Sequence, residues 1–139
     1  MKSETINSEI QLHRPLKISG ELINFFKSIL DGAKYDSDTL LYYKSQTPVV
    51  AFILLKGNIR LSDVESNNRD FIISKNQIIG LWELLTNGPS PWTATAIKSS
   101  QVLFFNRSSL LEFLDQNMHN LSSRDQELKL FLDHALDFA

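Results

Sequence analysis

The 139-residue sequence contains no cysteine, which excludes disulfides, thiolate nucleophiles and cysteine-based metal sites. It also lacks a basic run: 14 lysines and arginines stand against 16 acidic residues, giving a net charge of -2 and no electrostatic signature of nucleic-acid binding. The longest apolar run, Val49 to Leu55, is far shorter than the roughly 20 residues of a membrane-spanning helix. The polar N-terminus has no apolar signal-peptide core. We therefore expect a cytoplasmic protein that binds neither nucleic acid nor membrane.

Patterns for catalysis and metal binding are missing as well. The histidines His13, His119 and His134 lie outside the segments that resemble strands, whereas a metal site in a β-barrel needs clustered histidines and carboxylates on strands. No histidine is placed to activate a serine, and the glycines form neither a dinucleotide-binding nor a Walker motif. We therefore predict no catalytic residue, no metal and no cofactor, and expect that the chain is not an enzyme.

The amino-acid composition is typical of a globular domain. Hydrophobic residues make up 42% and charged residues 22% of the sequence, and 139 residues suit one domain. Residues 1–17 are polar and mixed, so we predict a flexible N-terminal arm there and a single domain over residues 18–139.

Helical periodicity brackets the chain. Apolar residues recur at helical spacing after Ser19, which predicts a helix with Ser19 as its N-cap and Gly32 at its C-terminal end. Ser109 and Glu112 have capping-box spacing ahead of a second helix. A third helix is predicted to begin near Ser122.

The middle of the chain has the pattern of a β-structure. Short segments rich in β-branched and aromatic residues, such as "TLLYYKS", "NIRLSDVE" and "TATAIKSSQVLFFNR", alternate with polar turns. They predict seven or eight strands in a sandwich or barrel, with a hairpin connection over residues 65–70. Val49 to Leu55 is apolar at every position, which predicts a strand covered on both faces. The fold class is therefore mainly β with flanking helices.

Two segments resemble a known family. "YDSDTLLYYKSQTPVVAFILLKGNIRL" (35–61), with its glycine-centred turn at Gly57, resembles the first half of the cyclic nucleotide-binding domain. "IIGLWELL…PWTATAIKSSQVLFFNRSSLLEFL" (78–114) resembles its phosphate-binding cassette and the elements that follow. The likeness covers roughly residues 20 to 135. It implies a jelly-roll β-barrel with one helix before it and two after it.

The cassette differs from the family pattern at the ligand-binding positions. Family members use a Phe-Gly-Glu step, whose carboxylate holds the ribose, and an Arg-Ser/Thr-Ala step, whose guanidinium holds the phosphate. This sequence keeps Gly80, but Leu81 follows it, Glu83 lies two positions further on, and we place Ser90-Pro91-Trp92 against the arginine step. Hydrogen bonds to charged groups contribute ~1.5–3 kcal/mol each, so these losses predict a degenerate site.

Three arginines are candidates to replace the missing one. Arg60 alternates with apolar neighbours in a strand, Arg69 falls in a hairpin turn, and Arg107 lies near a helix N-terminus. We expect all three on the surface. Glu83 is likewise expected as a solvated helix carboxylate rather than a ligand.

Aromatic residues suggest two alternatives for the pocket. Trp82, Trp92 and Phe71 are candidates to fill a vacated pocket, and ordinary packing in the core is the alternative for the tryptophans. If a nucleotide does bind, the candidate ligand residues are Gly80, Leu81, Glu83, Ser90, Trp92 and Thr93.

The last predicted helix carries an apolar stripe of Leu128, Phe131, Leu132 and Ala135. The stripe predicts one of two arrangements. It forms an intermolecular interface, with a second copy of the chain or with another protein, or it packs onto the chain's own barrel. Both alternatives stay open from the sequence.

Two functional hypotheses follow. The first is a non-catalytic regulatory or interaction module in signalling that has lost conventional cyclic nucleotide binding and has a protein partner. The second is a sensor that binds a cyclic mono- or dinucleotide through a rearranged cassette, using the Gly80 amides, Glu83 and stacking by Trp82 or Trp92.

Overall fold

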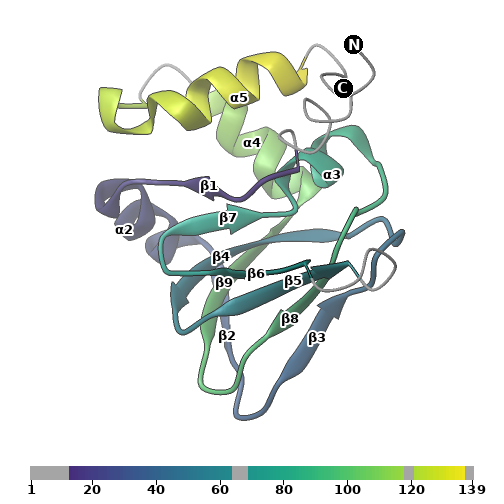
Figure 1. Cartoon of the computed structure of the whole chain (residues 1–139). Coiled ribbons are helices and arrows are strands. Elements are labelled where there is room, and N and C mark those ends of the chain that lie inside the picture. The colour runs from purple at the N-terminus through teal and green to yellow at the C-terminus, as the bar shows by residue number, and fades with distance from the viewer. Residues whose placement is uncertain (1–12, 64–68, 118–120, 137–139) are drawn as a thin grey trace.

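The computed structural model of the chain describes residues 13–63, 69–117 and 121–136. Two antiparallel sheets face each other, and helices cover the outer side of one of them, which confirms the mainly β jelly-roll architecture (Figure 1). The strands are β1 (Leu16–Lys17), β2 (Asp31–Lys34), β3 (Thr39–Tyr42), β4 (Val50–Lys56), β5 (Ile59–Asp63), β6 (Arg69–Ile73), β7 (Gln77–Ile79), β8 (Thr93–Ala96) and β9 (Gln101–Asn106).

The sheets have the strand orders β1-β7-β4-β9-β2 and β3-β8-β5-β6. The central strand β4 is buried on both faces, as the apolar run 49–55 predicts. Its alternate side chains serve two cores: Ala51 and Ile53 face the helices, whereas Phe52 and Leu54 face the second sheet. β5 and β6 pair antiparallel, as a hairpin requires, but the predicted connection over residues 65–70 extends too far, because Arg69 already belongs to β6 and pairs with Asp63 rather than lying in the turn. Residues 64–68 lie outside the described residues.

The helical layer lies against the five-stranded sheet, and α5 crosses over β1 (Figure 1). No described helix is both long enough and apolar enough to cross a membrane. The helical elements are α2 (Gly20–Ile29), α3 (Leu81–Thr86), α4 (Arg107–Asn117), the 3₁₀ turn η3 (Ser123–Asp125) and α5 (Gln126–Leu136). One helix thus precedes the barrel and two long helices follow it, as predicted, with the short α3 inside the cassette.

The start of α2 is predicted correctly and its end is not. Ser19 is the N-cap, and its Oγ accepts a hydrogen bond from the Leu22 N–H at 3.2 Å. Gly32 does not end the helix, because the backbone becomes extended at Leu30 and Gly32 lies inside β2.

The later helices begin slightly differently from the prediction. The predicted capping box at Ser109 and Glu112 is wrong: α4 begins at Arg107, and Asn106 Oδ1 accepts a hydrogen bond from the Ser109 N–H at 2.9 Å. Ser122 is the N-cap of η3, which continues directly into α5, close to the predicted start.

The predicted arm over residues 1–17 extends too far along the chain. Leu16 and Lys17 form β1, in which Leu16 pairs with Ile78 of β7. The side chains of Leu16 and Ile18 are buried in the core. Residues 1–12 lie outside the described residues.

The stripe on α5 packs onto the chain itself. Leu128, Phe131 and Leu132 are buried in the core formed with the five-stranded sheet. For these three side chains the predicted intermolecular interface is wrong and the packing alternative holds, because their apolar surface is already covered. The side chain of Ala135 lies outside the described residues.

Candidate functional site

Gly80 begins the cassette as the sequence predicts. It follows β7 with a φ of 80°, in the left-handed region that side chains other than glycine rarely adopt. Its carbonyl accepts a hydrogen bond from the Leu84 N–H at 3.0 Å, and α3 begins at the next residue. The turn and short helix of a phosphate-binding cassette are therefore present.

The side chains of α3 are directed at the helical layer rather than at the barrel interior. Leu81, which replaces the family's ribose carboxylate, is buried in the core beneath the helices. Glu83 is only 1% exposed, so its expected position as a solvated carboxylate is wrong. Its Oε1 lies 2.7 Å from His13 Nδ1, and its buried Oε2 has no hydrogen-bond partner among the described residues.

Trp82 also belongs to the helical layer. Its ring meets Phe131 of α5 edge to face at a centroid distance of 6.0 Å and stacks on His134 at 6.1 Å. The predicted role of Trp82 as a plug of the barrel pocket is therefore wrong, because the residue faces α5.

The interior of the barrel beside the cassette is occupied by aromatic rings from β3 and β4. Tyr42 and Phe52 are buried and stack with a centroid distance of 6.3 Å. The Tyr42 hydroxyl lies 3.8 Å from the position that a Cβ on Gly80 would take, and it forms a hydrogen bond with Ser90. Sequence reasoning missed both rings, because nothing in the strand pattern distinguishes a residue beside the cassette from any other inward-facing residue.

The other two candidate plug residues lie further out. Trp92 is half-buried against the inter-sheet core, and Phe71 of the edge strand β6 is 46% exposed. Their rings meet edge to face at 5.4 Å. The buried Trp92 Nε1 has no hydrogen-bond partner among the described residues.

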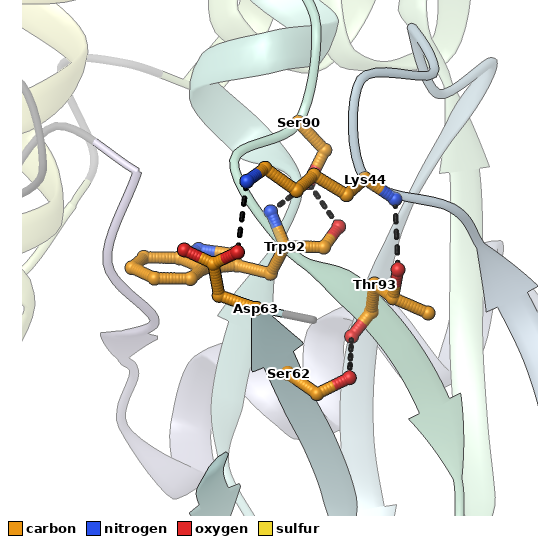
Figure 2. Close-up of polar contacts among 6 residues, drawn as sticks. All are labelled: Lys44, Ser62, Asp63, Ser90, Trp92 and Thr93. Atoms are coloured by element: carbon orange, nitrogen blue, oxygen red, sulfur yellow. Dashed lines mark hydrogen bonds and ion pairs between the residues drawn. The ribbon is translucent and has the colours of Figure 1, made fainter. Parts of the chain in front are cut away.

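Ser90 and Thr93 fix the loop that follows α3 (Figure 2). The Ser90 Oγ donates to the Trp92 carbonyl at 2.7 Å and accepts from the Trp92 N–H at 3.1 Å. The Thr93 Oγ1 accepts from the Lys44 N–H at 2.9 Å. The hydroxyls of both predicted ligand residues are therefore engaged in holding the loop itself.

The structure also brings a lysine to this loop. Figure 2 shows the Lys44 ammonium directed at Asp63, and its Nζ lies 2.8 Å from Asp63 Oδ1. Both side chains are largely buried, with exposed fractions of 26% and 21%. Sequence reasoning missed Lys44 because it is distant in sequence from both Asp63 and Thr93. One signal was available: Asp63 is two residues from Leu61 and so shares its inward face, where a carboxylate needs a partner.

The three arginines do not replace the family's guanidinium. Arg60 lies on the outward face of β5, as expected. Arg107 is exposed and donates to the Leu85 carbonyl at 3.3 Å. The side chain of Arg69 lies outside the described residues.

The start of β8 supports a second register for the arginine step. β8 begins at Thr93, and Thr93-Ala94 matches the last two residues of the Arg-Ser/Thr-Ala step. In that register Trp92, rather than Ser90, stands at the position of the arginine. This register differs by two residues from the alignment with Ser90-Pro91-Trp92.

Burial raises the pKa of the Tyr42 hydroxyl above its ordinary value, and the nearby Glu83 carboxylate raises it further, against a smaller opposing effect of the Ser90 hydrogen bond. Below about pH 10 the tyrosine is protonated in both the folded and the unfolded chain. Above that pH only the unfolded chain readily ionises, so the free energy of unfolding should fall by up to about 1.4 kcal/mol per pH unit. Urea unfolding at a series of alkaline pH values measures this slope.

Tyr42→Phe should remove this part of the alkaline slope, whereas Tyr43→Phe, at an exposed neighbouring position, should keep the wild-type slope. An unchanged slope in Tyr42→Phe would contradict the assignment.

Solved structures of low sequence identity share this fold. A protein from a cyclic-GMP-dependent signalling pathway in bacterial phytopathogenesis has a TM-score of 0.71 at 16% identity, over 88% of this chain and 94% of its own. The Thermus thermophilus catabolite activator protein has a TM-score of 0.62 at 19% identity over 84% of this chain, which spans 59% of that protein. The N-terminal domain of a Streptomyces coelicolor A3(2) transcriptional regulator has a TM-score of 0.61 at 16% identity, over 86% and 81% of the two chains.

A search of curated proteins gave no match. The sequence model of the cyclic nucleotide-binding domain matches residues 33–117, which is more than half of the chain and includes the strands β3 to β9 and the cassette. The match agrees with the jelly-roll topology and with the left-handed glycine turn that opens α3. The chain belongs to the cyclic nucleotide-binding domain family.

Proposed function

We propose that the chain is a non-catalytic regulatory or interaction module that has lost conventional cyclic nucleotide binding. The observation that carries the proposal is the replacement of both charged ligand groups by apolar side chains. Leu81 stands at the position of the ribose carboxylate and is buried under the helices, and Trp92 stands at the position of the arginine. Tyr42 and Phe52 occupy the adjoining barrel interior.

The electrostatics of the loop support the same proposal. An indole offers one N–H donor and no charge, whereas a guanidinium offers five donors in a fork that matches phosphate oxygens. Lys44, whose backbone N–H bonds to Thr93 of this loop, is already paired with Asp63 at 2.8 Å. A cyclic phosphate would have to displace that carboxylate before it gained the lysine as a counter-charge, and Asp63 would lose its ion pair with Lys44.

Isothermal titration with cyclic AMP and cyclic GMP tests this proposal. We expect no binding heat at micromolar ligand, and micromolar affinity for either nucleotide would overturn the proposal. Trp92→Arg is the matched variant, because it returns a guanidinium to the cassette without altering Gly80. A gain of affinity in Trp92→Arg, absent in Trp92→Phe, would locate the loss of binding at this residue.

A sensor with a rearranged cassette is the second candidate, and one observation favours it. The Lys44 backbone bonds to Thr93 beside Trp92, and the Trp92 Nε1 has no hydrogen-bond partner among the described residues, so an anion that displaces Asp63 would meet the lysine and could recruit the indole N–H. Extending the titration to cyclic dinucleotides separates the two candidates. Binding that is lost in Lys44→Ala would support the sensor, and no binding across the series would reject it.

A further inference from the structure

The segment that leads into the barrel lies between the cassette and the C-terminal helices. Residues 13–19, here called the N-terminal strap, run along β7 beneath α5 and end at the start of α2 (Figure 1). Leu16 and Ile18 anchor the strap in the core. At its far end Ser19 donates from its N–H and its Oγ to the Asp125 carboxylate, at 2.8 and 2.7 Å.

The near end of the strap contacts the cassette helix. His13 Nδ1 lies 2.7 Å from Glu83 Oε1, and the His13 ring meets Trp82 edge to face at a centroid distance of 6.3 Å. Trp82 in turn packs against Phe131 of α5. Three separate elements, the strap, α3 and α5, therefore meet at two consecutive residues of the cassette helix.

The burial of Glu83 makes this contact sensitive to loss of either partner. The Glu83 side chain is 1% exposed, and among the described residues only His13 bonds to its carboxylate. Removing one member of a buried pair leaves an unpartnered charge, which is strongly unfavourable. Without His13 the carboxylate would have no hydrogen-bond partner among the described residues unless α3 moved or water filled the space left by the imidazole, which is 18% exposed. The position of α3 in the core and the position of the strap on β7 therefore depend on each other through this contact.

We propose that the His13–Glu83 contact is a two-state latch that couples the cassette helix to the N-terminal strap. In the closed state α3 is seated and the strap lies on β7. In the open state Glu83 reaches solvent, α3 is displaced and the pairing of the strap with β7 is loosened. Any partner that binds one state better shifts both elements together. The latch goes beyond the proposed function, because it operates whether or not a nucleotide binds.

Amide hydrogen exchange on the full chain tests the latch with three variants. His13→Ala should speed amide exchange in α3 about tenfold, because the buried Glu83 carboxylate loses its hydrogen-bond partner there. The amides of α4, which has no part in this contact, should keep their protection. Glu83→Gln should loosen the strap, measured at Leu16 to Ile18, while α3 stays protected because no charge is buried there. The double variant His13→Ala/Glu83→Gln should recover the protection of α3 while the strap stays loose.

Arg14→Ala is the matched control. The Arg14–Glu127 pair also joins the strap to α5, but both side chains are about half exposed, so its loss should leave α3 exchange unchanged. The proposal is overturned if His13→Ala leaves α3 unchanged, if it speeds α4 equally, or if the double variant fails to restore α3. If His13→Ala alone does not fold, the proposal requires that His13→Ala/Glu83→Gln does fold, because that variant no longer buries a charge without a partner. These readouts are independent of the nucleotide titrations, so failure of the latch and failure of the proposed function are distinguishable.

Discussion

Gly57→Ala is expected to lower the free energy of unfolding by about 3 kcal/mol. Gly57 has a φ of +87°, in the turn between β4 and β5, and an added Cβ would lie 2.4 Å from Ser100 Oγ and 2.8 Å from Ser100 Cα. Ser100 is fully buried, and its Oγ accepts from the Asn58 N–H and donates to the Asn58 carbonyl. The variant therefore combines backbone strain with the displacement of two hydrogen bonds.

Gly20→Ala is the control for Gly57→Ala. Gly20 is the first residue of α2, and outside its own helix and its chain neighbours no described heavy atom lies within 4 Å of the place that an alanine methyl would take. The substitution should therefore stabilise slightly, by up to about 0.5 kcal/mol. Urea unfolding followed by tryptophan fluorescence measures both variants. Equal stabilities of Gly57→Ala and Gly20→Ala would contradict the assigned role of the turn.

Asp125→Ala is expected to cost about 2–4 kcal/mol of unfolding free energy, because hydrogen bonds to a charged group contribute more than neutral ones. The carboxylate is 3% exposed and accepts both the N–H and the hydroxyl of Ser19, the residue that caps α2. Removing it detaches η3 from the start of α2 and leaves the Ser19 amide without that acceptor. Thermal and urea unfolding measure the loss.

The neighbouring residue provides the comparison for Asp125. Arg124 pairs with Glu21 at 3.0 Å, but their side chains are 72% and 68% exposed. Exposed pairs contribute about 0–1 kcal/mol, so Arg124→Ala should change stability little. Asp125→Asn keeps one acceptor and should fall between the two variants. A stability of Asp125→Ala equal to that of Arg124→Ala would show that the buried carboxylate has no anchoring role.

The sequence predicted best those features that local pattern determines. The uninterrupted apolar run of β4 indicated burial on two faces, and Gly80 marked the turn into the cassette helix. Gly32 shows how a local signal misleads. A glycine after a helical stripe is typical of a helix end, but here it pairs with Leu103 in β2, where a Cβ would lie 3.2 Å from the Val102 carbonyl oxygen. Close approach between strands, rather than a helix end, explains that glycine.

The features of the site that were missed all join distant parts of the chain. The sequence indicated neither partner in advance: Asp63 shares the inward face of Leu61, but nothing near it pointed to Lys44, and nothing near Glu83 pointed to His13, because a charge in a strand or helix usually faces solvent. α3 is only six residues long, so its periodicity could not show that Glu83 lies beneath the strap. Such contacts follow from topology, which places the strap beside α3.

The packing of α5 on β1 has a consequence for the synthesis of the protein. Leu16 is among the first described residues to leave the ribosome, whereas its pairing partner Ile78, and Leu132 of α5 in the same core, follow much later. The side of the five-stranded sheet that α5 covers therefore stays open to water while the nascent chain is incomplete. During that interval the partly made protein presents an apolar surface on which chaperones can act, and only the arrival of α5 closes it.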